Sequence, residues 1–206
     1  RGHKALAQVE YANKRKMATL QYRVPAFARL DGWYTASLQA VDEQTDYIDS
    51  RRLELVGSRS GRLNERLNLV ASMHVLRERW AYNIADDGEG ALAPIDYTFA
   101  SFWFPSLRAE YVGVDDRLDP RRGAGSTLTV RGGRGGPDGD ATFAQVHATV
   151  QWFRGLGADS KLILRGDAGH TFTDEILNLP PSLRFFAGGD RSIRGYGWRE
   201  VGPRVE

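Results

Sequence analysis

The side chains best suited to catalysis or metal binding are scattered along this chain. Its histidines lie far apart, with no pair at the spacing of metal ligands. They are His3, His74, His147 and His170. The acidic stretch 86–89 lacks the alternating oxygen donors of a calcium loop, and no serine lies in a nucleophile elbow. The chain has no cysteine, which excludes thiol catalysis and disulfides. We therefore expect no enzyme activity, no metal site and no cofactor.

Arginine and glycine recur between residues 131 and 136, in a pattern that also occurs in RNA-binding tails. Here the run follows the alternating stretch 127–130 and leads into a turn signal, Pro137-Asp138-Gly139. A strand that enters a glycine-rich turn explains this pattern better than RNA binding does. The 28 basic and 26 acidic residues nearly balance, for a formal net charge of +2. We therefore expect no nucleic-acid partner.

The most unusual run of residues lies near the end of the chain, at 185–198. It contains the glycine pair Gly188-Gly189, which permits close backbone approach. Arg194 stands between Ile193 and Gly195, and a guanidinium held away from water needs carboxylate or aromatic partners. The aromatic side chains of the run would be poorly placed in water. These features predict a segment that packs against the protein.

Apolar and polar residues alternate with period two through most of the chain, which predicts strands and not helices. The clearest run sets Ala144, Val146, Ala148, Val150 and Trp152 against Gln145, His147, Thr149 and Gln151. We expect about nine or ten strands of roughly 9 to 15 residues, long enough to cross a bilayer at a tilt. Tight connections at 13–15 mix with longer polar ones at 86–90, as in antiparallel transmembrane barrels.

The two faces of these strands differ as a membrane barrel requires. One carries aliphatic and aromatic side chains that suit lipid, and the other carries polar side chains that suit a wet lumen. Aromatic residues near the expected strand ends form a candidate interfacial girdle: Tyr11, Trp33, Trp80, Tyr82, Trp103 and Trp152. The predicted fold class is all-β, an antiparallel transmembrane β-barrel. A soluble β-sandwich is the alternative that alternation by itself leaves open.

Residues 185–196 resemble the signature loop of the bacterial outer-membrane assembly factors, a phenylalanine-rich FxAGG run followed by [V/I]RG[F/Y]. Members of that superfamily join periplasmic POTRA domains to a barrel of about sixteen strands. The resemblance implies that the loop folds back into the barrel, where the arginine of the motif anchors it to the inner wall. The motif residues are Arg194, Gly195 and Tyr196, and the residues expected to shape the loop are Phe186, Gly188, Gly189 and Asp190.

By the family plan, the chain 1–206 would be a partial barrel, with strands over 1–172 and the inserted loop over 173–206. The POTRA domains, the first strand and about five final strands would lie outside it. Arg165 and Asp167 share the expected lumen face of the strand before the loop, so their parity makes them candidates to brace it.

The sequence of the motif most resembles that of the TamA branch, whose members assist the insertion or secretion of other outer-membrane proteins, especially autotransporters. The resemblance therefore implies a bacterial outer-membrane location and contact with its lipid. It also implies client outer-membrane proteins and a TamB-like inner-membrane partner. BamA-type factors and two-partner secretion transporters are the alternatives within the superfamily. A plain porin-like channel is the rival from another class, because alternation alone would suffice for it.

Overall fold

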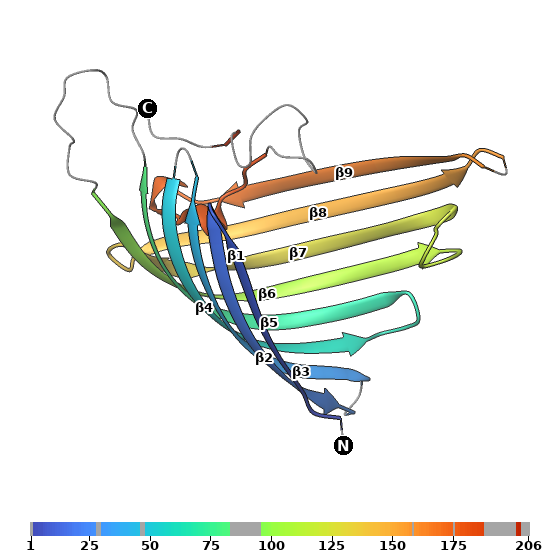
Figure 1. The fold of residues 1–206 in the computed structure, drawn as a ribbon, viewed down its shortest axis with the longest axis horizontal. Helices are drawn as coiled ribbons and strands as arrows, with labels where there is room; N and C mark the ends of the chain where they lie inside the picture. Colours follow the sequence, from blue (N-terminus) through green and yellow to red (C-terminus); the bar gives the residue numbers. More distant parts are fainter. Residues whose placement is uncertain are drawn as a thin grey trace.

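The computed structural model describes residues 2–27, 30–45, 48–82, 96–157, 159–174, 176–187 and 201–202. Within these ranges, nine strands form one antiparallel sheet in which each strand pairs with the next in the chain (Figure 1). The strands are β1 (Lys4–Ala12), β2 (Arg15–Ala26), β3 (Gly32–Gln44), β4 (Ile48–Arg62), β5 (Leu67–Tyr82), β6 (Thr98–Val114), β7 (Arg122–Gly136), β8 (Ala141–Gly155) and β9 (Lys161–Phe172). Two single-turn 3-10 helices follow, η1 (Ile176–Asn178) and η2 (Pro181–Leu183).

The sheet curves into an open trough, with the segment after β9 on its concave side (Figure 1). Among the described strands, β1 and β9 do not pair with each other, so the sheet is open at both edges. Strand lengths run from 9 residues in β1 to 17 in β6, slightly beyond the expected range. The predicted all-β antiparallel fold is confirmed. No helix in the described part of the chain is long and apolar enough to cross a membrane.

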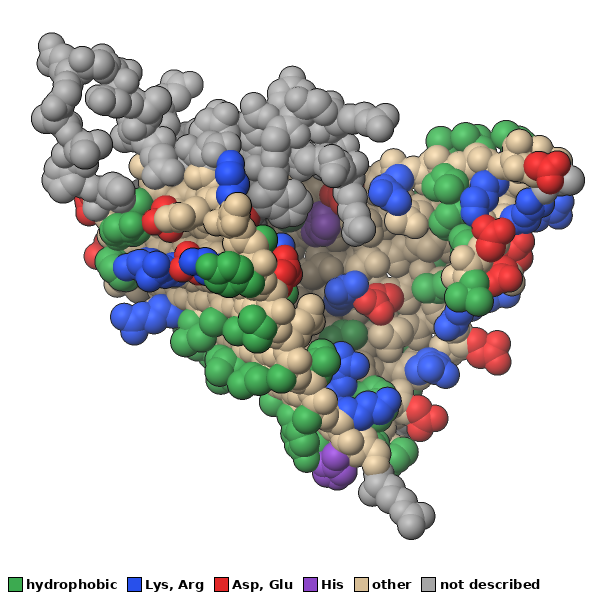
Figure 2. Space-filling model, viewed as in Figure 1, with side chains coloured by type: hydrophobic (Ala, Val, Ile, Leu, Met, Phe, Trp, Pro, Cys, Tyr) green, Lys and Arg blue, Asp and Glu red, His purple; other side chains and the backbone are tan. Residues whose placement is uncertain are grey.

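Alternation separates an apolar convex face from a polar concave face. One row across β2 to β6 places apolar side chains in register on the convex face: Leu20, Leu38, Leu55, Val75 and Trp103. These side chains are between 41% and 58% exposed. Figure 2 shows hydrophobic side chains gathered over the outer face of the first strands. A continuous exposed apolar band of this kind suits contact with lipid.

The arginine–glycine run lies in β7 and ends in a turn, as predicted. Gly133 is required by close packing, because a Cβ there would lie 2.2 Å from the Trp103 carbonyl oxygen and 2.6 Å from Cβ of Phe104. Gly136 has a φ of +108°, in the region that favours glycine, and it starts the turn into β8. Small residues in β7 therefore let the β6 aromatic side chains pack closely.

The predicted aromatic girdle is only partly correct. Tyr11 and Trp103 are 78% and 53% exposed on the convex face. Trp80, in contrast, is 1% exposed, and Tyr82 shares its concave side of β5. Placing these two side chains in lipid was wrong, because the apolar residues of β5 change face near Leu76, which is also 1% exposed.

Candidate functional site

Residues 176–187, called the inner segment below, cover the concave face at one end of the sheet. Two leucines carry its apolar contact, Leu179 at 0% and Leu183 at 2% exposure. They join one buried cluster with wall residues of β4, β5, β6 and β8: Ile48, Leu76, Trp80, Ala100, Phe102, Phe104 and Phe143. Complete burial of a leucine contributes about 1.5–3 kcal/mol, so this pair alone holds the segment firmly.

The local sequence explains why the segment leaves the sheet. Pro180 and Pro181 have no N–H to offer a neighbouring strand, and both are buried. Pro181 instead begins η2, whose turn closes with the Leu183 N–H donating to the Pro180 carbonyl at 2.9 Å. This tight turn directs Leu183 toward the wall.

Arg184 is the buried cation of the inner segment, at 5% exposure. Its Nε donates to the Leu179 carbonyl and its Nη2 to the Leu177 carbonyl, both at 2.7 Å. Its Nη1 donates to the Tyr82 hydroxyl, and the guanidinium lies 5.7 Å from the centre of that ring. Burial lowers the pKa of Arg184, which Tyr82 and Glu78 oppose. The group stays charged at neutral pH because arginine starts far above it.

Glu78 of β5 is the buried carboxylate that receives the segment, at 1% exposure. The hydroxyl of Ser50 on β4 donates to its Oε1 at 2.8 Å. The hydroxyl of Ser182 in the inner segment donates to its Oε2. A buried carboxylate needs such donors, since an unpaired one would cost several kcal/mol.

Gln145 of β8 is the second buried polar side chain that binds the inner segment, and it is also 1% exposed. Its amide nitrogen donates to the Leu183 carbonyl and, at 2.8 Å, to the Thr171 hydroxyl on β9. Its amide oxygen accepts a hydrogen bond from Nε of Arg131 on β7, at 2.7 Å. One side chain therefore ties three strands to the inner segment.

The polar contacts continue across the concave wall, away from the segment. Glu54 of β4 lies 2.8 Å from Nδ1 of His74 on β5. Arg52 donates to the Gln39 amide oxygen at 3.0 Å, and Gln39 reaches Thr19 of β2 at 3.3 Å.

The Phe104 ring joins these contacts to Gln145. The His74 ring stacks on Phe104 of β6, with the ring centres 4.7 Å apart. The Arg131 guanidinium lies over the same Phe104 ring, 5.9 Å from its centre. Arg131 then hydrogen-bonds Gln145, so the network extends to β8.

Most of the predicted loop residues lie outside the described residues: Gly188, Gly189, Asp190, Arg194, Gly195 and Tyr196. Phe186 is described and packs partly against the buried cluster. Ala187 and Val201 pair as an antiparallel bridge, with N···O distances of 2.7 and 3.0 Å. The chain therefore returns to the inner segment at residue 201, and the anchoring role of Arg194 stays a prediction.

The proposed bracing by Arg165 and Asp167 also stays a prediction. Asp167 Oδ1 lies 2.8 Å from Nε2 of His147, whose ring centre is 5.3 Å from that of Phe185 in the inner segment. Arg165 makes no hydrogen bond or ion pair with any described residue.

The docking residues Glu78, Gln145 and Arg184 were not singled out from the sequence as site residues. Glu78 shares one face of β5 with Leu76 and Trp80, and a carboxylate between two large apolar side chains on one face was the available signal.

The chain matches the Omp85 superfamily domain over residues 1–206. It therefore belongs to the Omp85 superfamily. It is also similar to the crystal structure of BamA from Haemophilus ducreyi lacking POTRA domains 1–3, with a TM-score of 0.80 at 14% sequence identity. The alignment covers 98% of this chain and 41% of that BamA chain. The likeness shows the fold, and this chain spans less than half the length of that BamA.

Proposed function

We propose that this chain forms the plugged part of a bacterial outer-membrane barrel that helps insert or assemble other outer-membrane proteins. The observation that carries this proposal is the docked inner segment, whose Leu179 and Leu183 are buried and whose Arg184 donates a hydrogen bond to Tyr82 of the concave wall. An open diffusion pore needs a wet lumen, whereas here a dry cluster occupies the wall at one end of the sheet. Membership of the Omp85 superfamily supports the same reading.

In this mechanism the residues of the chain hold the inner segment in place while client strands meet the barrel elsewhere. A client strand would pair with an exposed strand edge through backbone N–H and C=O groups. The wall contacts from Thr19 to Gln145 would keep the curved sheet rigid beside the segment. No bond chemistry is required.

The finer proposal is a TamA-like factor that serves autotransporters and works with a TamB-like inner-membrane partner. The motif sequence at residues 188–196, GGDRSIRGY, supports that branch. A BamA-type general assembly factor is equally compatible with the structural likeness.

The test expresses the full-length protein in cells depleted of their own assembly factors. A TamA-like factor restores surface display of an autotransporter and leaves porin levels unchanged, whereas a BamA-type factor restores both. Single-channel recording supplies an independent readout, since a plugged barrel gives small, erratic openings. A steady large conductance without rescue of any client would refute the assembly function and favour a porin.

A further inference from the structure

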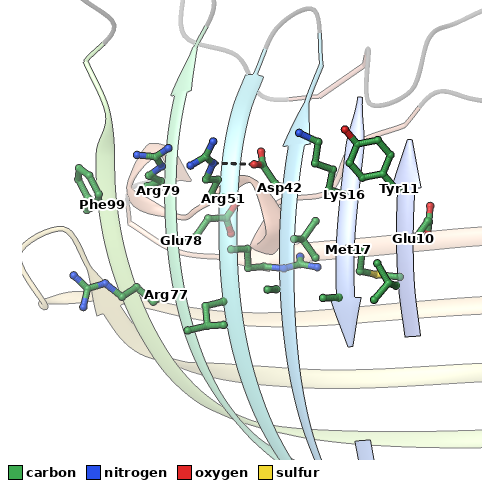
Figure 3. A pocket seen from close by; sticks show the side chains of 16 residues that line it. Glu10, Tyr11, Lys16, Met17, Asp42, Arg51, Arg77, Glu78, Arg79 and Phe99 are labelled. Atoms are coloured by element: carbon green, nitrogen blue, oxygen red, sulfur yellow. Dashed lines mark ion pairs between the residues drawn. The ribbon is translucent and has the colours of Figure 1, made fainter. Parts of the chain in front are cut away.

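The convex face carries a cluster of cations near the end of the strands where β1 turns into β2. In the register of the sheet, Lys16 lies opposite Asp42, Asp42 opposite Arg51, and Arg51 opposite Arg79. These residues therefore form a single row across β2 to β5. Arg77 lies on the same face, two residues from Arg79 along β5. Lys16, Arg51, Arg77 and Arg79 are called the basic cluster below. Figure 3 shows their side chains over neighbouring strands, with Tyr11 and Phe99 at the two sides.

The basic cluster borders the apolar band directly. The next row toward the middle of the strands contains Ala18, Ala40 and Leu53, which are in register, and Arg77 stands at the β5 end of that row. A strand rises about 3.3 Å per residue, so the two rows lie roughly 7 Å apart. A groove of about 560 Å³ spans both rows. Charged groups and apolar surface thus meet at the spacing of a lipid headgroup and the start of its acyl chain.

The described residues around the basic cluster carry a net positive charge. Asp42 pairs with Nε of Arg51 at 3.0 Å, yet the Arg51 side chain remains 56% exposed. Asp49 accepts a hydrogen bond from the Tyr97 hydroxyl at 2.9 Å. Among the described residues, these four cations against the two carboxylates leave an excess of two positive charges.

Aromatic rings hold two of the cations along the face. Lys16 Nζ lies 5.4 Å from the centre of the Tyr11 ring, and the Arg79 guanidinium lies 4.8 Å from that of Tyr97. Such contacts favour an extended cation over the sheet surface. They position the positive charge beside the apolar band and away from the lumen.

We propose that the basic cluster binds the phosphate of a membrane lipid, whose acyl chain lies along the apolar band. Arginine forks match phosphate oxygens, and the excess positive charge matches an anionic headgroup. The adjoining apolar rows are what distinguish a lipid from a free phosphate ion. This site is on the opposite face of the sheet from the inner segment, so its test is independent of the assembly function.

The experiment titrates the full-length protein in detergent with dilauroyl phosphatidylglycerol, dilauroyl phosphatidylcholine or inorganic phosphate, and counts bound molecules by native mass spectrometry. We expect the wild type to prefer phosphatidylglycerol by roughly tenfold. The double variant Arg77→Gln, Arg79→Gln should bind it roughly 25-fold more weakly, since one basic side chain contributes about fivefold near an anionic lipid. The variant Arg77→Lys, Arg79→Lys keeps both charges and loses only the planar fork, so its affinity should lie between those of the wild type and the glutamine variant.

The matched control is Arg23→Gln with Arg108→Gln, which removes two positive charges from the concave face and should bind like the wild type. Equal affinity for the two lipids, or an equal loss in both glutamine variants, would overturn the proposal. Inorganic phosphate that binds as tightly as phosphatidylglycerol would show a free-anion site and overturn it too. If the double variant fails to fold, Arg77→Gln alone should still weaken binding about fivefold.

Discussion

Replacing Arg184 with methionine should release the inner segment while leaving the strands paired. Methionine keeps much of the length of the side chain but removes the guanidinium that donates to Leu177, Leu179 and Tyr82. The carbonyl groups of Leu177 and Leu179 then lose their donor, and the Tyr82 hydroxyl loses its partner. The strands themselves lose no ladder hydrogen bond.

The magnitude follows from the burial of the group. Of these three hydrogen bonds, only the bond to Tyr82 joins Arg184 to the wall, because Leu177 and Leu179 belong to the inner segment itself. A hydrogen bond from a charged donor contributes about 1.5–3 kcal/mol. The dehydration of a 5% exposed guanidinium offsets part of this gain. Loss of the bond to the wall should therefore raise the undocked population roughly tenfold to a hundredfold.

Hydrogen exchange of the peptide containing residues 176–187 is the direct assay, with the strand peptides as internal reference. Exchange of the inner segment should accelerate by that factor, and single-channel recordings should show longer openings. Arg66→Met, at an exposed position of the β4–β5 turn, is the control and should change neither quantity. Unchanged exchange in the Arg184→Met protein would refute the clamp.

Three further changes probe the packing, the sheet and one turn. Leu183→Ala should destabilise docking by about 2–5 kcal/mol, measured by native-state proteolysis of the inner segment, whereas Leu128→Ala on the exposed convex face should have little effect. Gly133→Ala should lower the temperature at which the heat-modifiable electrophoretic migration of the protein is lost, because its Cβ would overlap β6. Gly57→Ala is the control and should leave that temperature unchanged, since nothing lies within 4 Å of a Cβ there. Equal effects of the two changes would contradict this account of the packing. Backbone N–H groups, that of Arg122 foremost, hold the pKa of Asp115 below its ordinary 3.8. The β6–β7 turn should therefore be ordered above that value and loosen as pH falls below it, seen as faster exchange of the Arg121 and Arg122 amides; Asp115→Asn should abolish this pH dependence.

Much of the architecture could be predicted from the sequence, because the signals involved are local. Alternation with period two reports which side chains share a face, and it correctly separated Val146 and Val150 from Gln145 and His147. The proline–glycine turn after β7 was readable for the same reason, since φ preferences belong to individual residues. Parity alone also placed Asp167 on the concave side of β9, next to His147.

The candidate site could not be assembled in this way, because its partners are brought together by curvature and register. Nothing local states that Glu78 meets Ser182, or that Gln145 meets Leu183, more than thirty residues away in each case. Trp80 and Tyr82 look like interfacial aromatics until the inner segment covers them.

The basic cluster makes the same division clear. The sequence by itself determined that the chain forms alternating strands with one apolar face, but it did not single out Lys16, Arg51, Arg77 or Arg79. Only the tertiary structure decided that they lie together, because hydrogen-bond register aligns residues of separate strands into one row. A shift of one residue in any pairing would send its charge to the lumen.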